Sequence, residues 1–380
     1  MEALFSGLMD ITWQSLIMIA IGGLLIYLGI AKEYEPNLLV PMGFGAIMVN
    51  LPFAAVWSFE GAEGVLQILY NFGIATELFP VLIFVAVGAM CDFSLLLGNP
   101  KMLFLGAAAQ FGIFATAIAV VVIGQMFPEL GIDLKSAASI GIIGAADGPT
   151  SIFVAAKFAP QFLGPISVAA YSYMSLVPII QPPVVMALTT REERLIRMKH
   201  TDASISKTAL IIFPIMVTII AGLLAPICVP LVGLLMFGNL LRVCGVLERL
   251  SLAAQNELAN LVTLLLGITI GGTMHWEKFL DPMTILILIL GFFAFIFDTA
   301  GGIIFVKFLN LFSKEKINPM CGAAGISAFP MSARVMQQIA KKEDPTNFIL
   351  MPAITANVAG QIASAIAGGM VLVIVPWLLS

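Results

Sequence analysis

Runs of about twenty apolar residues recur along this sequence and constrain its fold more than any other feature. Clear runs lie at 13–31, 102–126, 164–189, 208–227 and 283–306. A helix needs about 20 such residues to cross a bilayer, and inside lipid only helices or closed barrels satisfy every backbone polar group. We therefore predict an all-α polytopic membrane protein with about ten to twelve membrane segments.

The composition is that of a chain that lies mostly in lipid. Hydrophobic residues make up 60% and charged residues 11% of the sequence, whereas a soluble domain carries about 25% charged residues. We expect membrane lipid as a partner and no nucleic acid. The 2 histidines are too few for a multi-histidine metal site, and the 4 cysteines lack metal-ligand spacing and are expected to fill packing positions.

One basic cluster divides the chain into halves of similar length. The segment "TTREERLIRMKH" (189–200) holds the largest basic cluster of the chain, with Arg191, Arg194, Arg197 and Lys199. Short basic loops remain in the cytoplasm. We therefore predict a cytoplasmic loop at 191–207, between a first membrane repeat at 1–190 and a second at 208–380.

An acidic residue and a helix break interrupt the apolar run from about 137 to 158, in the segment "GAADGPTSIF" (144–153). A charged residue at the centre of a membrane helix costs about 2.5–3.5 kcal/mol, so Asp147 needs a partner or a function. Irregular backbone survives at this depth only where protein or a water-filled cavity shields it. Freed carbonyls and the hydroxyls of Thr150 and Ser151 would complete an all-oxygen site. A single carboxylate suits Na⁺ or H⁺ better than Ca²⁺; the alternative is a structural aspartate.

The second half contains a similar segment, "CGAAGISAFPMSAR" (321–334). Both segments begin with Gly-Ala-Ala, at Gly144 and Gly322, and a basic residue follows each, Lys157 or Arg334. We predict broken segments at 318–334 and 353–369, and two inverted repeats whose broken helices or hairpins meet at mid-membrane, as in secondary transporters. The alternative is coincidence in a chain rich in alanine and glycine.

Several neutral polar residues accompany these breaks. Tyr173 precedes an expected break at Pro178 and would lie opposite Asp147 if the two segments form a hairpin. Asn318, Ser327, Asn357 and Ser364 offer oxygen atoms in the second half. Each of these residues serves equally well as a helix–helix contact or as an ion ligand.

Two charged residues admit two interpretations each. Arg334 follows Pro330 and either reaches towards the membrane surface or binds a carboxylate substrate through its planar guanidinium. Asp298, in "FIFDTAGGIIF", is a second carboxylate within an apolar run. It serves either helix packing or an ion path.

Four segments resemble one known family. They are "GAADGPTSIF", "AAYSYMSLVP" (169–178), "RLSLAAQNELANLV" (249–262) and "INPMCGAAGISAFPMSAR" (317–334). Together they are similar to the β subunit of the sodium-pumping, biotin-dependent decarboxylases, which act on oxaloacetate, methylmalonyl-CoA or glutaconyl-CoA. The chain is short for an oxaloacetate member, which favours a CoA-ester decarboxylase.

The resemblance implies a translocase subunit in the bacterial cytoplasmic membrane. Such a subunit decarboxylates carboxybiotin and couples the reaction to Na⁺ export and proton uptake. Biotin is carried by a partner and is not bound covalently here. The implied partners are a carboxyltransferase subunit, a biotin carrier protein and a small membrane subunit, with homo-oligomer formation. The alternative function is a Na⁺- or H⁺-coupled carboxylate transporter without catalysis.

The resemblance also implies roles for individual residues. Catalysis is assigned to Asp147, Tyr173 and Arg334, and carboxybiotin binding to Arg334 and Gly322. The implied Na⁺ ligands are Asp147, Asn318, Ser327, Asn357 and Tyr173. Access to the site would change by an elevator-type movement of the half that contains the broken segments.

Overall fold

The computed structural model describes residues 10–59, 62–198 and 205–380. Within these ranges it contains 7 helices long and apolar enough to cross a membrane, or up to 9 if each of two bent helix pairs is one span. The all-α membrane class is confirmed. The 7 to 9 candidate spans are fewer than the ten to twelve membrane segments predicted, and two further apolar helices, Pro36–Val49 and Leu134–Ala145, are shorter than a full span. Part of the predicted loop at 191–207 lies outside the described residues.

The first half is a series of helices with several interruptions. Its elements are α2 (Trp13–Ala31), α3 (Pro36–Val49), β1 (Ser58–Phe59), β2 (Ala62–Glu63), α4 (Val65–Leu69), η1 (Tyr70–Ile74), α5 (Leu78–Met90), α6 (Ser94–Gly98), α7 (Met102–Ala108), α8 (Phe111–Met126), η2 (Pro128–Leu130), α9 (Leu134–Gly141), η3 (Ile142–Ala145), α10 (Gly148–Phe158), η4 (Pro160–Phe162), α11 (Leu163–Ser175) and α12 (Val177–Leu188). The apolar run at 164–189 is therefore two helices, which meet at a bend of 68°.

The second half contains the two longest helices. Its elements are α13 (Arg191–Arg194), α14 (Lys207–Leu224), η5 (Pro226–Cys228), α15 (Val229–Val243), α16 (Glu248–Ala253), η6 (Ala254–Leu258), α17 (Ala259–Gly272), α18 (Trp276–Phe279), α19 (Pro282–Phe312), α20 (Pro319–Ala323), α21 (Met331–Glu343) and α22 (Leu350–Leu379). One of the two longest, α22, continues without interruption through 353–369, so the break predicted there is absent: this apolar, small-residue run holds no residue that ends a helix.

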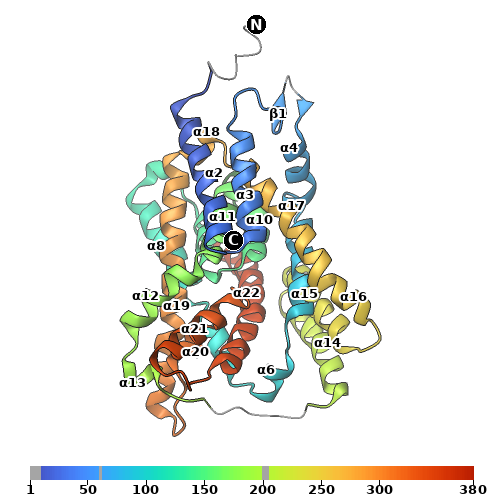
Figure 1. Cartoon of the computed structure of the whole chain (residues 1–380), viewed down its shortest axis with the longest axis vertical. Coiled ribbons are helices and arrows are strands. Elements are labelled where there is room, and N and C mark those ends of the chain that lie inside the picture. Colours follow the sequence, from blue (N-terminus) through green and yellow to red (C-terminus); the bar gives the residue numbers. More distant parts are fainter. Residues whose placement is uncertain (1–9, 60–61, 199–204) are drawn as a thin grey trace.

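The two ends of the molecule's long axis carry different elements. Helix α18 lies at one end and α13 at the other, with α20, α21 and the start of the chain's last helix, α22, nearer to α13 (Figure 1). We call these the α18 end and the α13 end. Helix α19 begins beside α18 and, at 31 residues, is long enough to reach most of the way to the α13 end.

Small residues let several helices approach closely. A Cβ atom on Gly22 of α2 would lie 2.6 Å from the carbonyl oxygen of Gly43 of α3. A Cβ atom on Gly271 of α17 would lie 2.1 Å from the carbonyl oxygen of Met42, also on α3. Close backbone approach is a common way for membrane helices to associate. Helices α2, α3 and α17 therefore form one tightly packed group.

The predicted interruption at Asp147 is present, and local chemistry explains it. Ala146 adopts a left-handed conformation with φ of 52°, which ends η3. Asp147 then caps α10, and Pro149 lies in the first turn of that helix. Aspartate is favoured at helix N-caps and proline in the first helical turn. The same residues that end one helix therefore begin the next.

Candidate ion-binding site

Asp147 is buried, and among the described residues its side chain is bound by hydroxyl and amide groups alone. Asp147 is 4% exposed. Its Oδ2 atom accepts hydrogen bonds from the hydroxyls of Thr150 and Ser364, each at 2.7 Å, and its Oδ1 atom accepts one from the Thr150 amide at 3.4 Å. Ser364 lies on α22, so this contact joins residues 217 positions apart.

The two chain breaks meet beside this carboxylate. The amide of Ser327, in the segment between α20 and α21, donates to the carbonyl oxygen of Ala145 at 3.1 Å. The Ser327 hydroxyl donates to the carbonyl oxygen of Gly360 on α22 at 2.9 Å. The side-chain amide of Gln361 also donates to the Ser327 carbonyl oxygen. Helix α22 thus connects both breaks at one level of the molecule.

Asn357 contributes an oxygen atom without a donor. Its side-chain nitrogen donates to the carbonyl oxygen of Ile326 at 2.6 Å, which fixes the amide against the second break. Its Oδ1 atom is buried and has no hydrogen-bond partner among the described residues. A buried acceptor without a partner costs free energy. A cation bound to this oxygen would remove that cost.

Basic side chains are absent from the surroundings of Asp147 within the described ranges. The ion pairs of these ranges involve other carboxylates, such as Glu77 with Lys157 at 3.0 Å and Glu343 with Arg194 at 2.7 Å. A carboxylate at this depth without a basic partner is suited to binding a cation or a proton.

Tyr173 makes no hydrogen bond to Asp147 among the described residues, although the sequence predicts that the two lie opposite each other. Its hydroxyl donates to the carbonyl oxygen of Leu288 on α19, and its ring packs near Phe292. Tyr171 lies on the other side of α11, and its ring would be 2.3 Å from a Cβ atom on Gly148. The sequence did not separate the two tyrosines, because residues two positions apart on a helix point in nearly opposite directions.

Both polar atoms of the Asn318 side chain bind groups other than Asp147. Its side-chain oxygen accepts from the Met320 amide at 3.0 Å and so caps α20. Its side-chain nitrogen donates to the carbonyl oxygens of Arg194 and Ile196, at 3.0 and 2.9 Å. In this geometry Asn318 fastens the start of α20 to the loop after α13 rather than facing Asp147.

Gly322 and Arg334 lie on either side of the second break. A Cβ atom on Gly322 would be 2.1 Å from the carbonyl oxygen of Gly302, so this glycine lets α20 contact α19 closely. Arg334 lies in the first turn of α21 and is exposed. Burial raises the pKa of Glu35, in the turn before α3, and the charge of Arg334 partly opposes that rise. Arg334 is therefore close enough to this turn to act on it electrostatically.

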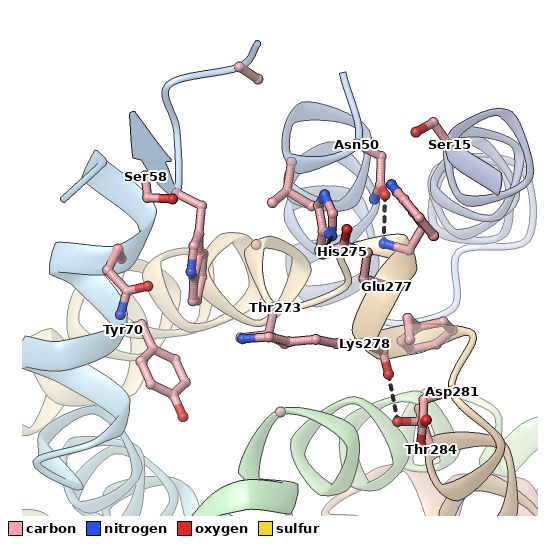
Figure 2. Close-up of a pocket in the computed structure, with 18 of the residues that line it drawn as sticks. Ser15, Asn50, Ser58, Tyr70, Thr273, His275, Glu277, Lys278, Asp281 and Thr284 are labelled. Atoms are coloured by element: carbon pink, nitrogen blue, oxygen red, sulfur yellow. Dashed lines mark hydrogen bonds and ion pairs between the residues drawn. The ribbon is translucent and has the colours of Figure 1, made fainter. Parts of the chain in front are cut away.

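A cavity of about 990 Å³ lies at the α18 end, away from Asp147. Asn50, Thr273, His275 and Asp281 are among its polar lining residues, and Asn50 accepts a hydrogen bond from the backbone of α18 (Figure 2). The turn after α10, including Gln161, also lines it. The turn that follows the helix begun by Asp147 therefore reaches this cavity.

The comparisons with known proteins agree across the chain. A family model described as the Na⁺-transporting oxaloacetate decarboxylase beta subunit matches residues 14–375. The methylmalonyl-CoA decarboxylase subunit beta of Propionigenium modestum is 48% identical, with 97% of this chain and 96% of the relative covered. The glutaconyl-CoA decarboxylase subunit beta of Acidaminococcus fermentans is also 48% identical, with the same coverage. A probable oxaloacetate decarboxylase beta chain of Vibrio cholerae is 43% identical, with 96% of each chain covered.

These matches extend over nearly the whole length of this chain and of each relative. The sequence identities are far above the level at which only a fold is shared. The apolar helices agree with a multi-pass membrane protein of bacteria. The chain belongs to the β-subunit family of the Na⁺-transporting decarboxylases.

Proposed function

We propose that this chain decarboxylates carboxybiotin presented by a carrier subunit and couples the reaction to Na⁺ export and proton uptake. The observation that carries the proposal is Asp147, a buried carboxylate without a basic partner in the described ranges, placed where two chain breaks meet. Membership of the Na⁺-transporting decarboxylase family supports the choice of ion and of reaction class.

Na⁺ is held by the oxygen atoms around the two breaks. Asp147 supplies the negative charge, and Asn357 supplies the amide oxygen that has no donor among the described residues. The hydroxyls of Thr150 and Ser364 donate to Asp147 and keep lone pairs that can face a cation. Ser327, which ties the second break to α22, holds the backbone in place. Oxygen ligands are the preferred partners of hard cations.

Carboxybiotin approaches from the side of Arg334. Its carboxylate pairs with the guanidinium, which can form two parallel hydrogen bonds to it. The bond between the ureido nitrogen and the carboxylate carbon breaks, CO₂ leaves, and the nitrogen takes up a proton. The family resemblance assigns proton transfer to Tyr173; in the geometry described above, this residue would have to leave its contact with Leu288 to reach Asp147.

The two broken segments form inverted repeats that enter the membrane from opposite faces. The second is anchored at the α13 end, because Asn318 and Glu343 both bind Arg194. The helix that follows the first break reaches the opposite end, where Gln161 lines the cavity. By the positive-inside rule the α13 end is cytoplasmic. The broken segments then slide or rock against the group formed by α2, α3 and α17.

The partners follow from the reaction. A carrier must present biotin, a carboxyltransferase subunit must load it, and a small membrane subunit and further copies of this chain complete the complex. The relatives at 48% identity are named for methylmalonyl-CoA and glutaconyl-CoA, and those named for oxaloacetate are 43% identical. These values favour a CoA ester as the donor of the carboxyl group.

The test uses the purified subunit, or its complex, in proteoliposomes. Free carboxybiotin is added with and without Na⁺, and CO₂ release and ²²Na⁺ movement are measured together. We expect CO₂ release that depends on Na⁺ and drives its transport. An Arg334→Ala variant should require more carboxybiotin at unchanged Na⁺ dependence, whereas Lys341→Ala, an exposed basic control on the same helix, should behave as wild type. Na⁺-coupled transport of a carboxylate, without release of CO₂, would instead identify the chain as a secondary transporter.

A further inference from the structure

A second buried carboxylate, Asp298 of α19, lies outside the site described above. Asp298 is 0% exposed. Its Oδ1 atom accepts a hydrogen bond from the amide of Ile113, in the first turn of α8, at 3.1 Å, and the backbone amide of Gly112 also acts on the carboxyl group. Its Oδ2 atom is buried and has no hydrogen-bond partner among the described residues. Asp298 therefore differs from Asp147, whose corresponding oxygen accepts two hydroxyl hydrogen bonds.

The surroundings of Asp298 are packed closely. A Cβ atom on Gly112 would lie 2.3 Å from its Oδ1 atom and 2.5 Å from the carbonyl oxygen of Ala294. Thr116 lies one turn further along the same face of α8, and its hydroxyl oxygen is also buried without a partner in the described ranges. The carboxyl group of Asp298 thus has, among the described residues, one unpartnered oxygen atom and little space around it.

No positive charge in the described part of the chain neutralises this carboxylate. The elements packed against this part of α19 are α7, α8, η3, α9, α11, α12 and α20. Their ionisable residues are Lys135, Tyr171, Tyr173 and Cys321. Lys135 is exposed at the start of α9. Lys307, on α19 itself, pairs with Glu193 at 3.2 Å and donates to the carbonyl oxygen of Leu188.

An ionised carboxylate with an unpartnered oxygen is strongly disfavoured in such a place, and the neutral acid form is favoured. A sodium ion would need several oxygen ligands around it, whereas a proton needs no coordination shell. We propose that Asp298 is a proton-binding site of this subunit, occupied by a proton in the arrangement described here, and that it serves the proton uptake that accompanies decarboxylation.

A chain of hydrogen bonds connects this part of α19 to the second break. The side-chain amide of Gln181, on α12, donates to the hydroxyl of Thr299 at 3.4 Å and to the carbonyl oxygen of Ala323 at 2.9 Å. Its side-chain oxygen accepts from the hydroxyl of Ser332 at 2.9 Å. Ser332 precedes Arg334 by two positions on α21. A change of charge at Asp298 can therefore act on the helix that carries Arg334.

The role given to Asp298 rests on the proposed function, whose reaction consumes one proton. Loss of CO₂ from carboxybiotin leaves a ureido nitrogen that must gain one proton. The neutral carboxyl group of Asp298 becomes a carboxylate when it releases its proton to this reaction. It is restored when a proton enters from the other face. Asp147 then binds Na⁺, and Asp298 binds H⁺.

The test compares Asp298→Asn with wild type in the full complex, in proteoliposomes. Asparagine keeps an oxygen to accept from Ile113, so the variant should fold, but it cannot bind or release a proton. Infrared spectroscopy should show the carbonyl band of a buried protonated carboxyl group in wild type and its loss in Asp298→Asn. Asp147→Asn should keep that band. Asp281→Asn is the matched control, because Asp281 caps the same helix outside the core and asparagine also caps well.

Transport measurements give the second readout. We expect Asp298→Asn to lose proton uptake across the membrane and to release CO₂ more slowly, while the Na⁺ concentration for half-maximal CO₂ release stays that of wild type. An unchanged infrared band in Asp298→Asn would overturn the proposal, as would normal proton uptake. Loss of one bound ²²Na⁺ per chain would overturn it in favour of a second sodium site. If wild type itself released no CO₂ from carboxybiotin, the proposed function would fail, while the infrared comparison would still report on Asp298.

Discussion

Asp147 loses its water on entering the membrane interior and gains two hydroxyl donors, from Thr150 and Ser364. Hydrogen bonds to charged groups contribute about 1.5–3 kcal/mol each. Two of them offset the cost of about 2.5–3.5 kcal/mol for a charge at the centre of a membrane helix. The carboxylate is thus tolerated without a basic partner, and its charge remains available to a cation.

Asp147→Asn should remove that charge and leave the local fold intact, because asparagine is also a good helix N-cap. Loss of one partner of a buried charged pair costs about 2–5 kcal/mol, so the Na⁺ concentration for half-maximal decarboxylation should rise at least about 30-fold. The measurement is the Na⁺ dependence of CO₂ release, with membrane insertion checked by expression. Wild-type turnover in this variant would end the proposal for Asp147.

Ser364→Ala should show how far α22 contributes to the ion site. It removes one hydroxyl donor to a charged group, worth about 1.5–3 kcal/mol, and should raise the Na⁺ requirement roughly 10-fold or more. Ser167→Ala is the matched control, because this buried hydroxyl donates to the Leu163 carbonyl oxygen within α11. Equal effects of the two changes would mean that Ser364 acts on stability alone.

At the scale of elements, the site arises where two chain breaks meet. The break at Asp147 and the break between α20 and α21 touch through Ala145 and Ser327. A local irregularity at Ala109 and Gln110 separates α7 from α8, although 102–126 still forms one span. Gly325 of the second break lies against α7, since a Cβ atom there would be 2.7 Å from the carbonyl oxygen of Leu105. Composition does not reveal this irregularity, because the run remains apolar throughout.

Gly322→Ala tests whether this glycine acts through helix packing. The added Cβ would collide with the backbone of Gly302, so α20 must move away from α19. Forced overpacking typically costs about 1–3 kcal/mol, and we expect lower thermal stability together with weaker Na⁺ activation. Gly23→Ala is the control, because no atom lies within 4 Å of a Cβ at that position. A normal unfolding temperature with selective loss of carboxybiotin binding would point to direct substrate contact instead.

At the scale of the whole molecule, the linker between the two halves holds the second broken segment at the α13 end. The buried Arg194 pairs with Glu343, at the end of α21, and its carbonyl oxygen accepts from Asn318 and Asn347. Hydrogen bonds from Thr346, together with Arg197, lower the pKa of Asp344 to about 2. The ion pair between Arg197 and Asp344 therefore stays charged at neutral pH, and it is lost only as the pH falls towards 2.

Arg194→Gln should loosen this anchor. Removing one partner of a buried ion pair lowers the stability by about 3–5 kcal/mol. Glu343 would keep only its ion pair with the exposed Arg191, at 3.4 Å, among the described residues. We expect a lower unfolding temperature in detergent and a smaller effect of Arg191→Gln, since exposed pairs contribute about 0–1 kcal/mol. Identical unfolding temperatures for the two variants would show that the linker does not fasten the segment.

The sequence by itself determined the membrane class, the interruption at Asp147, the basic linker and the family, because apolar runs, a buried acid and short motifs are local properties. It also named Thr150, Ser327, Asn357 and Ser364 as oxygen donors. The tertiary structure alone decided which of these oxygens meet Asp147, that Tyr171 rather than Tyr173 lies against its helix, and that Asn318 binds the linker. These contacts join residues far apart in the chain and depend on the rotation of each helix about its axis, which composition and spacing leave open.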